Sequence, residues 1–284
     1  MVSPRTVETP PQVRSTVIEP TGRGVSLAAS YVPAAEPEAS VLLVHGWTGS
    51  KEDFSVLMPL LADRGFSAYS YDQRGQYESA AAGDDFSLDA FAEDAAAFAQ
   101  QLPGHVAGQP VHLLGHSFGG LVAARTAIRH PGLWASVTLF CTGPGGHGDG
   151  SGLQLMIDSL ATMEIGDVYA QKVQIEQAQG APPNAPEVEA FLRRRFVTGN
   201  PASLSGMSQI LIDTADQIDE LRATGLPVFV VRGEGDIAWP QQEQDEMAAR
   251  LGTSVVVIPD ADHCPNYEAP EATADTLAKL LRSL

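Results

Sequence analysis

Residues 111–129 read VHLLGHSFGGLVAARTAIR, and this stretch decides the fold that we expect. Its first four residues form an almost continuous apolar run, as in a strand covered on both faces by helices. Its last nine are rich in alanine and aliphatic residues and favour a helix. Between them, Gly115, Ser117 and Gly119 form a G-x-S-x-G motif. The stretch therefore predicts a serine on a tight turn between a strand and a helix.

This turn makes Ser117 the candidate nucleophile. The flanking glycines lack Cβ atoms where the chain turns tightly, so the serine hydroxyl projects above the strand ends at the positive end of the next helix. The alternative is a glycine-rich connection that carries an ordinary surface serine. Because a serine hydroxyl is a poor nucleophile until a base removes its proton, an imidazole must come from elsewhere in the chain.

His263 is the candidate general base and acid among the seven histidines. It follows the last predicted strand and so lies at the carboxyl edge of the sheet, where open α/β sheets build their sites. Asp236, at the end of the preceding strand, is the candidate that orients this imidazole, and Glu234 is its local competitor. The order serine, acid, histidine is the one that this strand-turn-helix motif requires.

The developing oxyanion needs backbone donors, and two are predicted. One is the N–H of Phe118, directly after the nucleophile, and the other is the N–H of Trp47 in the loop HGWTGS at residues 45–50. Alternatively, the Trp47 ring serves only to pack the wall of the pocket.

Short apolar runs alternate with helix-like segments, which predicts an α/β fold with a mostly parallel central sheet flanked by helices. The predicted central strands are Val41–Val44, Ser67–Tyr71, Val111–Leu114, Val137–Phe140, Val228–Val231 and Ser254–Ile258, with an antiparallel edge from Ser15–Ile18 and Val25–Tyr31. The predicted flanking helices are Lys51–Arg64, Leu88–Gln101, Gly119–Arg129, Gln241–Leu251 and Pro270–Leu284.

Residues 147–224 contain helical patterns but no convincing strand, so we predict an inserted helical cap there and a core made of residues 1–146 and 225–284. The cap helices are expected at Leu153–Met163, Val188–Phe196 and Ser205–Ile212. Glycine and proline residues punctuate both borders of the insertion.

The composition excludes several classes of partner. With 35 acidic and 17 basic side chains the formal net charge is −18, which repels nucleic acid and anionic lipid surfaces. No apolar run is long enough to span a bilayer, and the first residues lack a signal-peptide pattern, so we expect a cytoplasmic protein. Cys141 and Cys264 are too few for a disulfide framework, and free thiols are expected, although one bond between them is the alternative.

The motifs together resemble the α/β-hydrolase superfamily from about residue 25 to the C-terminus. The resemblance is carried by HGWTGS at 45–50, DQRG at 72–75, GHSFGG at 115–120, the acid Asp236 and the final segment HCPNYE at 263–268. Tyr77, Asp260 and Asp262 depart from the usual pattern, since glycine is common at these places. The resemblance implies a serine hydrolase of the esterase type with a helical cap.

Several activities share this arrangement. Ser117 stands where haloalkane dehalogenases and epoxide hydrolases carry an aspartate, so those two are disfavoured. A thioesterase, lactonase, carbon–carbon bond hydrolase or aminopeptidase can use the same three residues, and some members of the fold are ligand receptors, lyases or cyclases. No metal-ligand spacing or phosphate-binding motif is present, so no metal or cofactor is expected.

The expected substrate is a mid-sized, apolar or aromatic ester, thioester or lactone, and not a phosphorylated or coenzyme A-linked molecule. Aromatic rings of Trp47, Phe118 and Trp239 should surround the reacting carbonyl, and Trp239 and Tyr77 are the predicted substrate contacts. Met156, Met163 and Met207 should add adaptable lining. The basic run Arg193–Arg195 is expected to be a solvated surface. The sequence does not indicate an oligomeric state.

Overall fold

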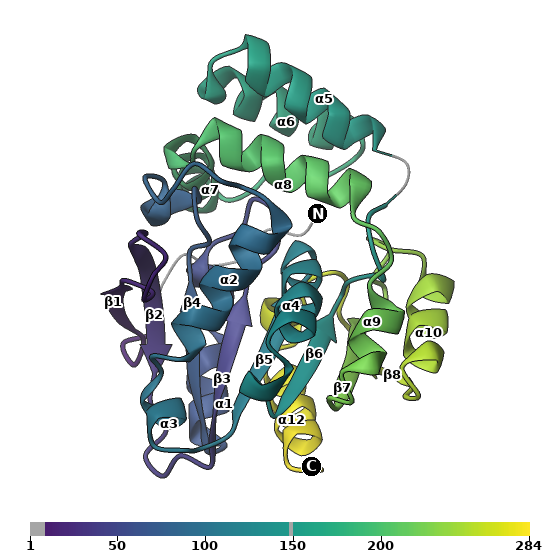
Figure 1. Cartoon of the computed structure of the whole chain (residues 1–284). Coiled ribbons are helices and arrows are strands. Elements are labelled where there is room, and N and C mark those ends of the chain that lie inside the picture. The colour runs from purple at the N-terminus through teal and green to yellow at the C-terminus, as the bar shows by residue number, and fades with distance from the viewer. Residues whose placement is uncertain (1–8, 148–149) are drawn as a thin grey trace.

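A computed structural model describes residues 9–147 and 150–284 and shows a single eight-stranded sheet (Figure 1). The strand order is β1-β2-β4-β3-β5-β6-β7-β8, antiparallel at the β1–β2 and β2–β4 pairs and parallel at all others. The strands are β1 Arg14–Ile18, β2 Leu27–Val32, β3 Ala39–Val44, β4 Phe66–Tyr71, β5 Val111–His116, β6 Ser136–Phe140, β7 Val228–Gly233 and β8 Val255–Ile258. The predicted fold class and the antiparallel edge are confirmed.

Helices cover both faces of this sheet (Figure 1). Apart from the four described below, the helical segments of the described chain are η1 Lys51–Phe54, α1 Leu57–Asp63, η2 Tyr77–Ser79, α2 Leu88–Ala99, α3 Pro103–Val106, α4 Phe118–Arg129, η3 Pro131–Leu133, α9 Ile218–Ala223, α10 Gln241–Arg250, α11 Pro265–Glu268 and α12 Pro270–Leu281. The predicted helix at Lys51–Arg64 is divided into η1 and α1, and the other predicted helices are present with slightly different ends.

Alternate residues of each central strand enter two separate cores. On β3, Leu42 and Val44 pack in the cluster under α2 and α4. Val41 and Leu43 of the same strand pack in the cluster under α1 and α12. Because successive side chains of a strand point to opposite faces, an apolar residue is needed at every position, which explains the continuous apolar runs in the sequence.

Four helices inserted between β6 and β7 lie above the carboxyl edge of the sheet (Figure 1). They are α5 Ser151–Thr162, α6 Ile165–Ala178, α7 Pro186–Thr198 and α8 Pro201–Asp213. The sequence predicts α5, α7 and α8. It does not single out α6, whose β-branched residues lower helix propensity. The helix α9, inside the predicted limits 147–224, packs instead beside α4 and α10 next to the sheet.

None of the helices in the described ranges is long and apolar enough to cross a lipid bilayer. Cys141 and Cys264 are both buried and are not joined by a disulfide bond, in agreement with the expectation from the sequence.

A buried histidine in the sheet makes the stability of the fold depend on pH. His112 of β5 is 4% exposed, and its Nδ1 atom lies 2.8 Å from Oγ of Ser136 on the neighbouring strand β6. The edge of its ring meets the Phe66 ring at a centroid distance of 6.2 Å. Burial disfavours the imidazolium and lowers the pKa of His112 to about 4.

In a His112→Asn variant, the free energy of unfolding is expected to depend less on pH below about 6.5 than in the wild type. Between pH 6.5 and about 4 the unfolded chain binds a proton that folded His112 does not. The stability contributed by neutral His112 is therefore complete above pH 6.5 and is lost as the pH falls toward 4. Urea unfolding of both proteins from pH 7.5 to 4.5 should show a wild-type free energy of unfolding that falls more steeply, by about 1.4 kcal/mol per pH unit. Parallel curves would contradict this assignment.

Candidate active site

Ser117 occupies a strained turn between β5 and α4. Its backbone has φ 55° and ψ −121°, a conformation that residues other than glycine rarely adopt. Its N–H donates to the Phe140 carbonyl at 2.9 Å, and its carbonyl accepts from the N–H of Gly120 at 2.8 Å. These two hydrogen bonds hold the turn, which directs the serine side chain into a cavity at the carboxyl edge of the sheet.

The neighbouring glycines allow this turn to sit close against other backbone. A Cβ atom at Gly115 would collide with the carbonyl oxygen of Gly119, and a Cβ atom at Gly119 would collide with the carbonyl oxygen of Val44. A side chain at Gly46 would come within 3.1 Å of Cβ of Ser117. The glycines are therefore required by packing between β3, β5 and α4.

His263 and Asp236 are brought together across 27 residues of sequence. Nδ1 of His263 lies 2.8 Å from Oδ1 of Asp236, whose side chain is fully buried. Asp236 also accepts from the N–H of Ala238 at 3.1 Å and from Nε2 of Gln244 at 3.3 Å. The side chain of Glu234, the competing acid, is exposed and does not contact this imidazole in the described part of the chain.

The protonation of this pair follows from its surroundings. Burial raises the pKa of Asp236, but the hydrogen bonds and charge of His263 and the further donors lower it by more, so the pKa stays below its ordinary value. Asp236 is then an ionised acceptor, and Nδ1 of His263 must donate to it. In the neutral form of this imidazole, the lone pair is therefore on Nε2.

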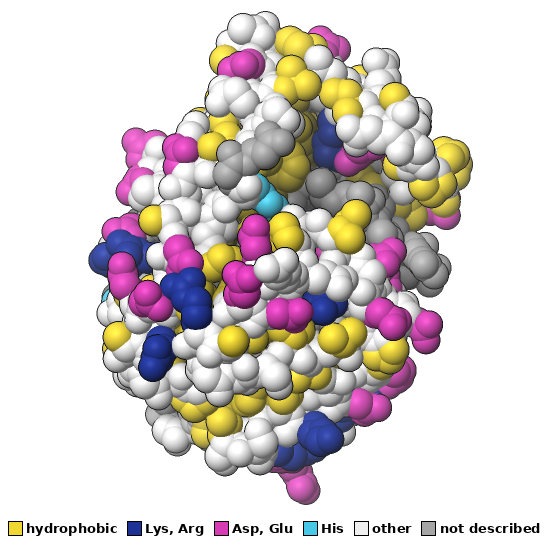
Figure 2. Space-filling model, turned by 90° about the vertical axis from the view of Figure 1, so that its right-hand side faces the viewer, with side chains coloured by type: hydrophobic (Ala, Val, Ile, Leu, Met, Phe, Trp, Pro, Cys, Tyr) yellow, Lys and Arg dark blue, Asp and Glu magenta, His cyan; other side chains and the backbone are white. Residues whose placement is uncertain are grey.

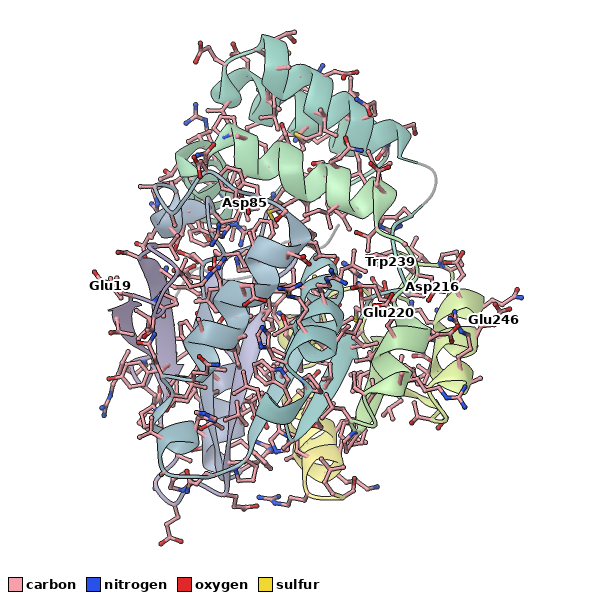
Figure 3. All side chains as sticks on the ribbon, in the orientation of Figure 1. Glu19, Asp85, Asp216, Glu220, Trp239 and Glu246 are labelled. Atoms are coloured by element: carbon pink, nitrogen blue, oxygen red, sulfur yellow. The ribbon has the colours of Figure 1, made fainter. Side chains whose placement is uncertain are left out.

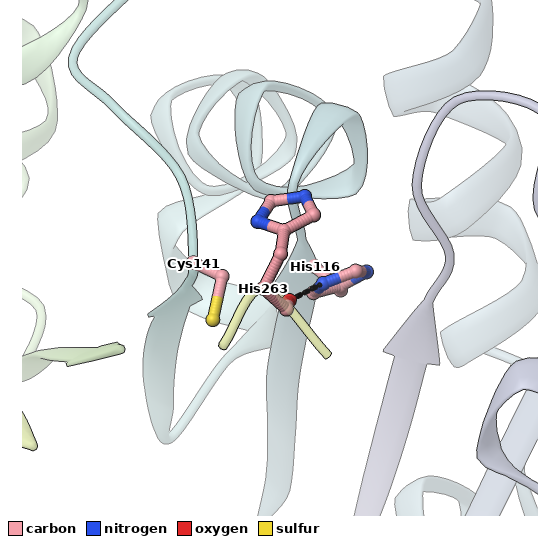
Figure 4. A group of neighbouring side chains, drawn as sticks. All are labelled: His116, Cys141 and His263. Carbon is pink, nitrogen blue, oxygen red and sulfur yellow. Dashed lines mark hydrogen bonds between the residues drawn. The ribbon is translucent and has the colours of Figure 1, made fainter. Parts of the chain in front are cut away.

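A second histidine fixes the backbone of His263. Nε2 of His116 lies 2.7 Å from the carbonyl oxygen of His263, and since a carbonyl only accepts, His116 donates (Figure 4). Cys141 lies on the other side of His263, and the three residues can each offer an atom within 4.8 Å of the others. Burial raises the pKa of the Cys141 thiol well above its usual value, so Sγ keeps its proton, whereas a metal ion binds the thiolate. The arrangement therefore fits a hydrogen-bonded network better than a metal site.

The loop after β3 presents the predicted donors. Among residues 9–147 and 150–284, the N–H groups of Trp47 and Phe118 have no hydrogen-bonding acceptor. His45 holds this loop: its Nε2 accepts from the N–H of Gln73 at 3.1 Å, so its Nδ1 donates to the Gly46 carbonyl at 2.8 Å. Burial lowers the pKa of His45 to about 4 and keeps this ring neutral.

The DQRG segment at residues 72–75 makes hydrogen bonds that fix the loop after β3. The buried carboxylate of Asp72 accepts from the backbone N–H of Lys51 at 2.8 Å and from its Nζ at 3.0 Å. Arg74 makes two hydrogen bonds of 2.6 Å to Asp94 on α2. These charge-assisted bonds tie the loops after β3 and β4 to the core.

A cavity of about 940 Å³ opens above Ser117 and His263, between the sheet and the inserted helices. Figure 2 shows the hollow on one face of the molecule, with hydrophobic side chains around it and a histidine inside. Its walls include Trp47, Met156 and Val188. A cavity of this size accommodates a mid-sized organic molecule.

Of the predicted substrate contacts, Trp239 lines this cavity. It lies near the connections between the sheet and the inserted helices (Figure 3). Its ring stacks on His147 with centroids 4.1 Å apart, and its Nε1 donates to the Gly145 carbonyl at 3.2 Å. His147 also lines the cavity and was not predicted, because no local motif distinguishes it.

Tyr77 and the Phe118 ring do not line the cavity, so the expectation that they contact substrate is corrected. Tyr77 packs edge-on against Phe191, and its hydroxyl accepts from Nε of Arg194 at 3.3 Å. The Phe118 ring is fully buried in the core against Phe91. Side chains adjacent in sequence to a site point where helix packing directs them, and here that is away from the cavity.

The predicted methionine lining is also only partly right. Met156 lines the cavity. Met163 is exposed and Met207 is buried in the main core, so neither reaches the cavity walls.

The basic run on α7 is not uniformly solvated as expected. Arg193 and Arg194 are exposed, but the Arg195 side chain is only 10% exposed and pairs with Asp53 of η1 at 2.6 Å. Both residues of this pair line the cavity. Because 142 positions separate them, no short-range pattern in the sequence indicates their contact.

The chain was compared with known proteins. Residues 41–276 match the profile described as the Alpha/beta hydrolase family. A pimeloyl-acyl-carrier-protein methyl ester esterase from Methylococcus capsulatus is 30% identical over 262 residues, which cover 86% of this chain and 94% of that protein. A non-heme haloperoxidase from Rhodococcus erythropolis is 25% identical over 247 residues, covering 78% of this chain and 85% of that protein.

Solved structures agree in fold. A structure described among carboxylesterases of Nitrososphaera gargenis has a TM-score of 0.75 at 18% identity and covers 95% of this chain and 100% of its own. An enol-lactonase from Burkholderia xenovorans also has a TM-score of 0.75 at 18% identity, covering 94% of this chain and 100% of its own.

Proposed function

The chain belongs to the alpha/beta hydrolase family, and from that premise we propose that it cleaves a carboxylic ester, thioester or lactone through an acyl-enzyme on Ser117. The observation that carries the proposal is that the groups needed for this reaction are found together. A strained serine, a histidine hydrogen-bonded to a buried carboxylate, and two backbone N–H groups without an acceptor among the described residues all lie at the carboxyl edge of the sheet.

The proposed reaction begins when Nε2 of His263 takes the proton of the Ser117 hydroxyl as Oγ attacks the substrate carbonyl carbon. The imidazolium that forms is stabilised by the ionised Asp236. His263 then gives the proton to the leaving alcohol, thiol or lactone oxygen, and an acyl-serine remains. A water molecule, deprotonated by His263, attacks this acyl group, and His263 returns the proton to Oγ of Ser117 as the acid leaves.

The negative charge on the carbonyl oxygen is assigned to the N–H groups of Trp47 and Phe118. Since neither has an acceptor among the described residues, both can donate without first breaking a protein hydrogen bond. Donors already fixed by packing need little reorganisation as negative charge develops on the carbonyl oxygen. This preorganisation is the main source of transition-state stabilisation in such sites.

The substrate is proposed to be mid-sized and largely apolar. Trp47, Met156, Val188 and Leu192 on the cavity walls favour burial of apolar groups. The names of an esterase, carboxylesterases and an enol-lactonase among the similar proteins point to the same class of bond.

The proposed nucleophile is tested with a fluorophosphonate probe. Wild-type protein should become covalently labelled on Ser117, and Ser117→Ala should lose labelling and at least about 10⁴-fold of its ester turnover, because no other group supplies the nucleophile. Mass spectrometry of the labelled peptide identifies the site, and wild type unfolded in urea serves as the unreactive control. A folded wild-type protein that the probe never labels would overturn the proposal.

The role of Asp236 is tested by Asp236→Asn beside the matched variant Glu234→Gln. An asparagine amide can donate to Nδ1 of His263 and so hold the ring in the tautomer whose Nε2 cannot accept a proton. The kcat of Asp236→Asn should fall by about 10⁴-fold with the fold retained. Glu234 is exposed, and its variant should keep wild-type turnover. A large loss in Glu234→Gln alone would reassign the acid.

The apolar walls are tested with p-nitrophenyl esters of increasing acyl length and with acyl-coenzyme A substrates. Each methylene buried in the cavity should raise kcat/KM by about fourfold until the chain outgrows it. Coenzyme A substrates should react more slowly than the simple esters. Equal rates for acetyl and hexanoyl esters, or a clear preference for coenzyme A substrates, would contradict the proposed substrate class.

A further inference from the structure

Arg195 of α7 is a cation on the cavity walls that the proposed reaction does not use. Its side chain is nine-tenths buried, yet it belongs to the cavity walls together with Ser117. One end of the guanidinium is engaged, because Nη1 donates to Oδ1 of Asp53 at 2.6 Å and lies 3.4 Å from Oγ of Ser50. The Phe191 ring lies 5.4 Å from the guanidinium carbon and supports its face.

The other edge of this guanidinium makes no hydrogen bond within the part of the chain that the structure describes. Among the described residues, Nε and Nη2 of Arg195 have no hydrogen-bonding partner, although neither atom is sealed from solvent. Arg195 is one of the residues that line the cavity. Nε–H and Nη2–H point in parallel from one edge, which is the fork that matches the two oxygens of a carboxylate.

The ion pair of Arg195 and Asp53 is connected to the loop beside the nucleophile. Oδ2 of Asp53 accepts from the N–H of Ser50 at 3.3 Å, so the ion pair is joined to the loop that carries Trp47. The same loop abuts Ser117 through Gly46. A ligand group bound to Arg195 would therefore lie in the same cavity as Ser117, with the loop of residues 45–50 between them.

We propose that the Nε–Nη2 edge of Arg195 binds a carboxylate of the substrate. This inference rests on the proposed function and narrows it: the ester, thioester or lactone would carry a free carboxylate separated from the reacting carbonyl by a few carbon atoms. The other described cation on the cavity walls, Lys172, is held by both oxygens of Glu176 at 2.8 Å. Arg195 is the better candidate because its free edge has the geometry of the ligand.

Asp53 has two opposing effects on this site. Its hydrogen bond orients the guanidinium, while its negative charge weakens the attraction of Arg195 for a second carboxylate. The inference therefore predicts opposite results for two variants. Removing the guanidinium should abolish the preference for a carboxylate, whereas removing the charge of Asp53 should increase it.

The test compares two p-nitrophenyl esters of equal shape, the monoester of glutaric acid and its analogue with a terminal amide. The quantity measured is the ratio of kcat/KM for the acid to that for the amide. The ratio should fall at least about tenfold in Arg195→Met and rise in Asp53→Asn, because charge-assisted hydrogen bonds from Arg195 act only on the carboxylate. Arg193→Met, an exposed residue on the same helix, should leave the ratio unchanged.

Arg195→Lys keeps the charge but not the fork and should also lose most of the preference, which guards against poor folding of Arg195→Met. In Ser117→Ala, calorimetric titration with the two esters should show tighter binding of the acid without turnover. An unchanged ratio in all variants, with normal turnover of the amide ester, would overturn this inference alone. A wild-type protein that hydrolyses neither ester would overturn the proposed function.

Discussion

The rest of the site depends on the backbone of Ser117, held at φ 55° and ψ −121° where β5 turns into α4. Such a conformation costs about 1–3 kcal/mol and persists only when its surroundings determine it. Here the determinants are the close contact of Gly119 with the backbone of β3 and the hydrogen bond from Ser117 to Phe140 on β6. The central strands of the sheet thus fix where the serine hydroxyl can be.

Parallel strands place all their carboxyl ends at one edge, and this brings distant segments together around that serine. Asp236 follows β7 and His263 follows β8, so two neighbouring strand ends supply the acid and the imidazole. Buried histidines then fix the loops by hydrogen bonds. His45 donates to the Gly46 carbonyl before Trp47, and His116 donates to the carbonyl of His263. Both are kept neutral by burial, which allows each to serve as a fixed donor.

The inserted helices close the site from above, and α7 and α8 are bound to the loops below them. Ser203 of α8 donates to the Arg74 carbonyl at 2.9 Å, and Arg195 of α7 pairs with Asp53. The insertion therefore does more than cover the cavity with apolar side chains. It places one oriented cation beside the loop proposed to bind the oxyanion, and this is where discrimination among substrates can arise.

The sequence by itself determined the order of the strands and of the longer helices around the sheet, and which residues stand at the tight turn, because buried parallel strands must be apolar on both faces and that turn requires glycines. It therefore predicted the sheet, and it pointed to Ser117, Asp236 and His263. Only the tertiary structure decided that Tyr77 packs away from the cavity and that Arg195 meets Asp53 within it. The direction of a side chain depends on packing between elements far apart in the chain, and local sequence patterns do not indicate which distant elements pack together.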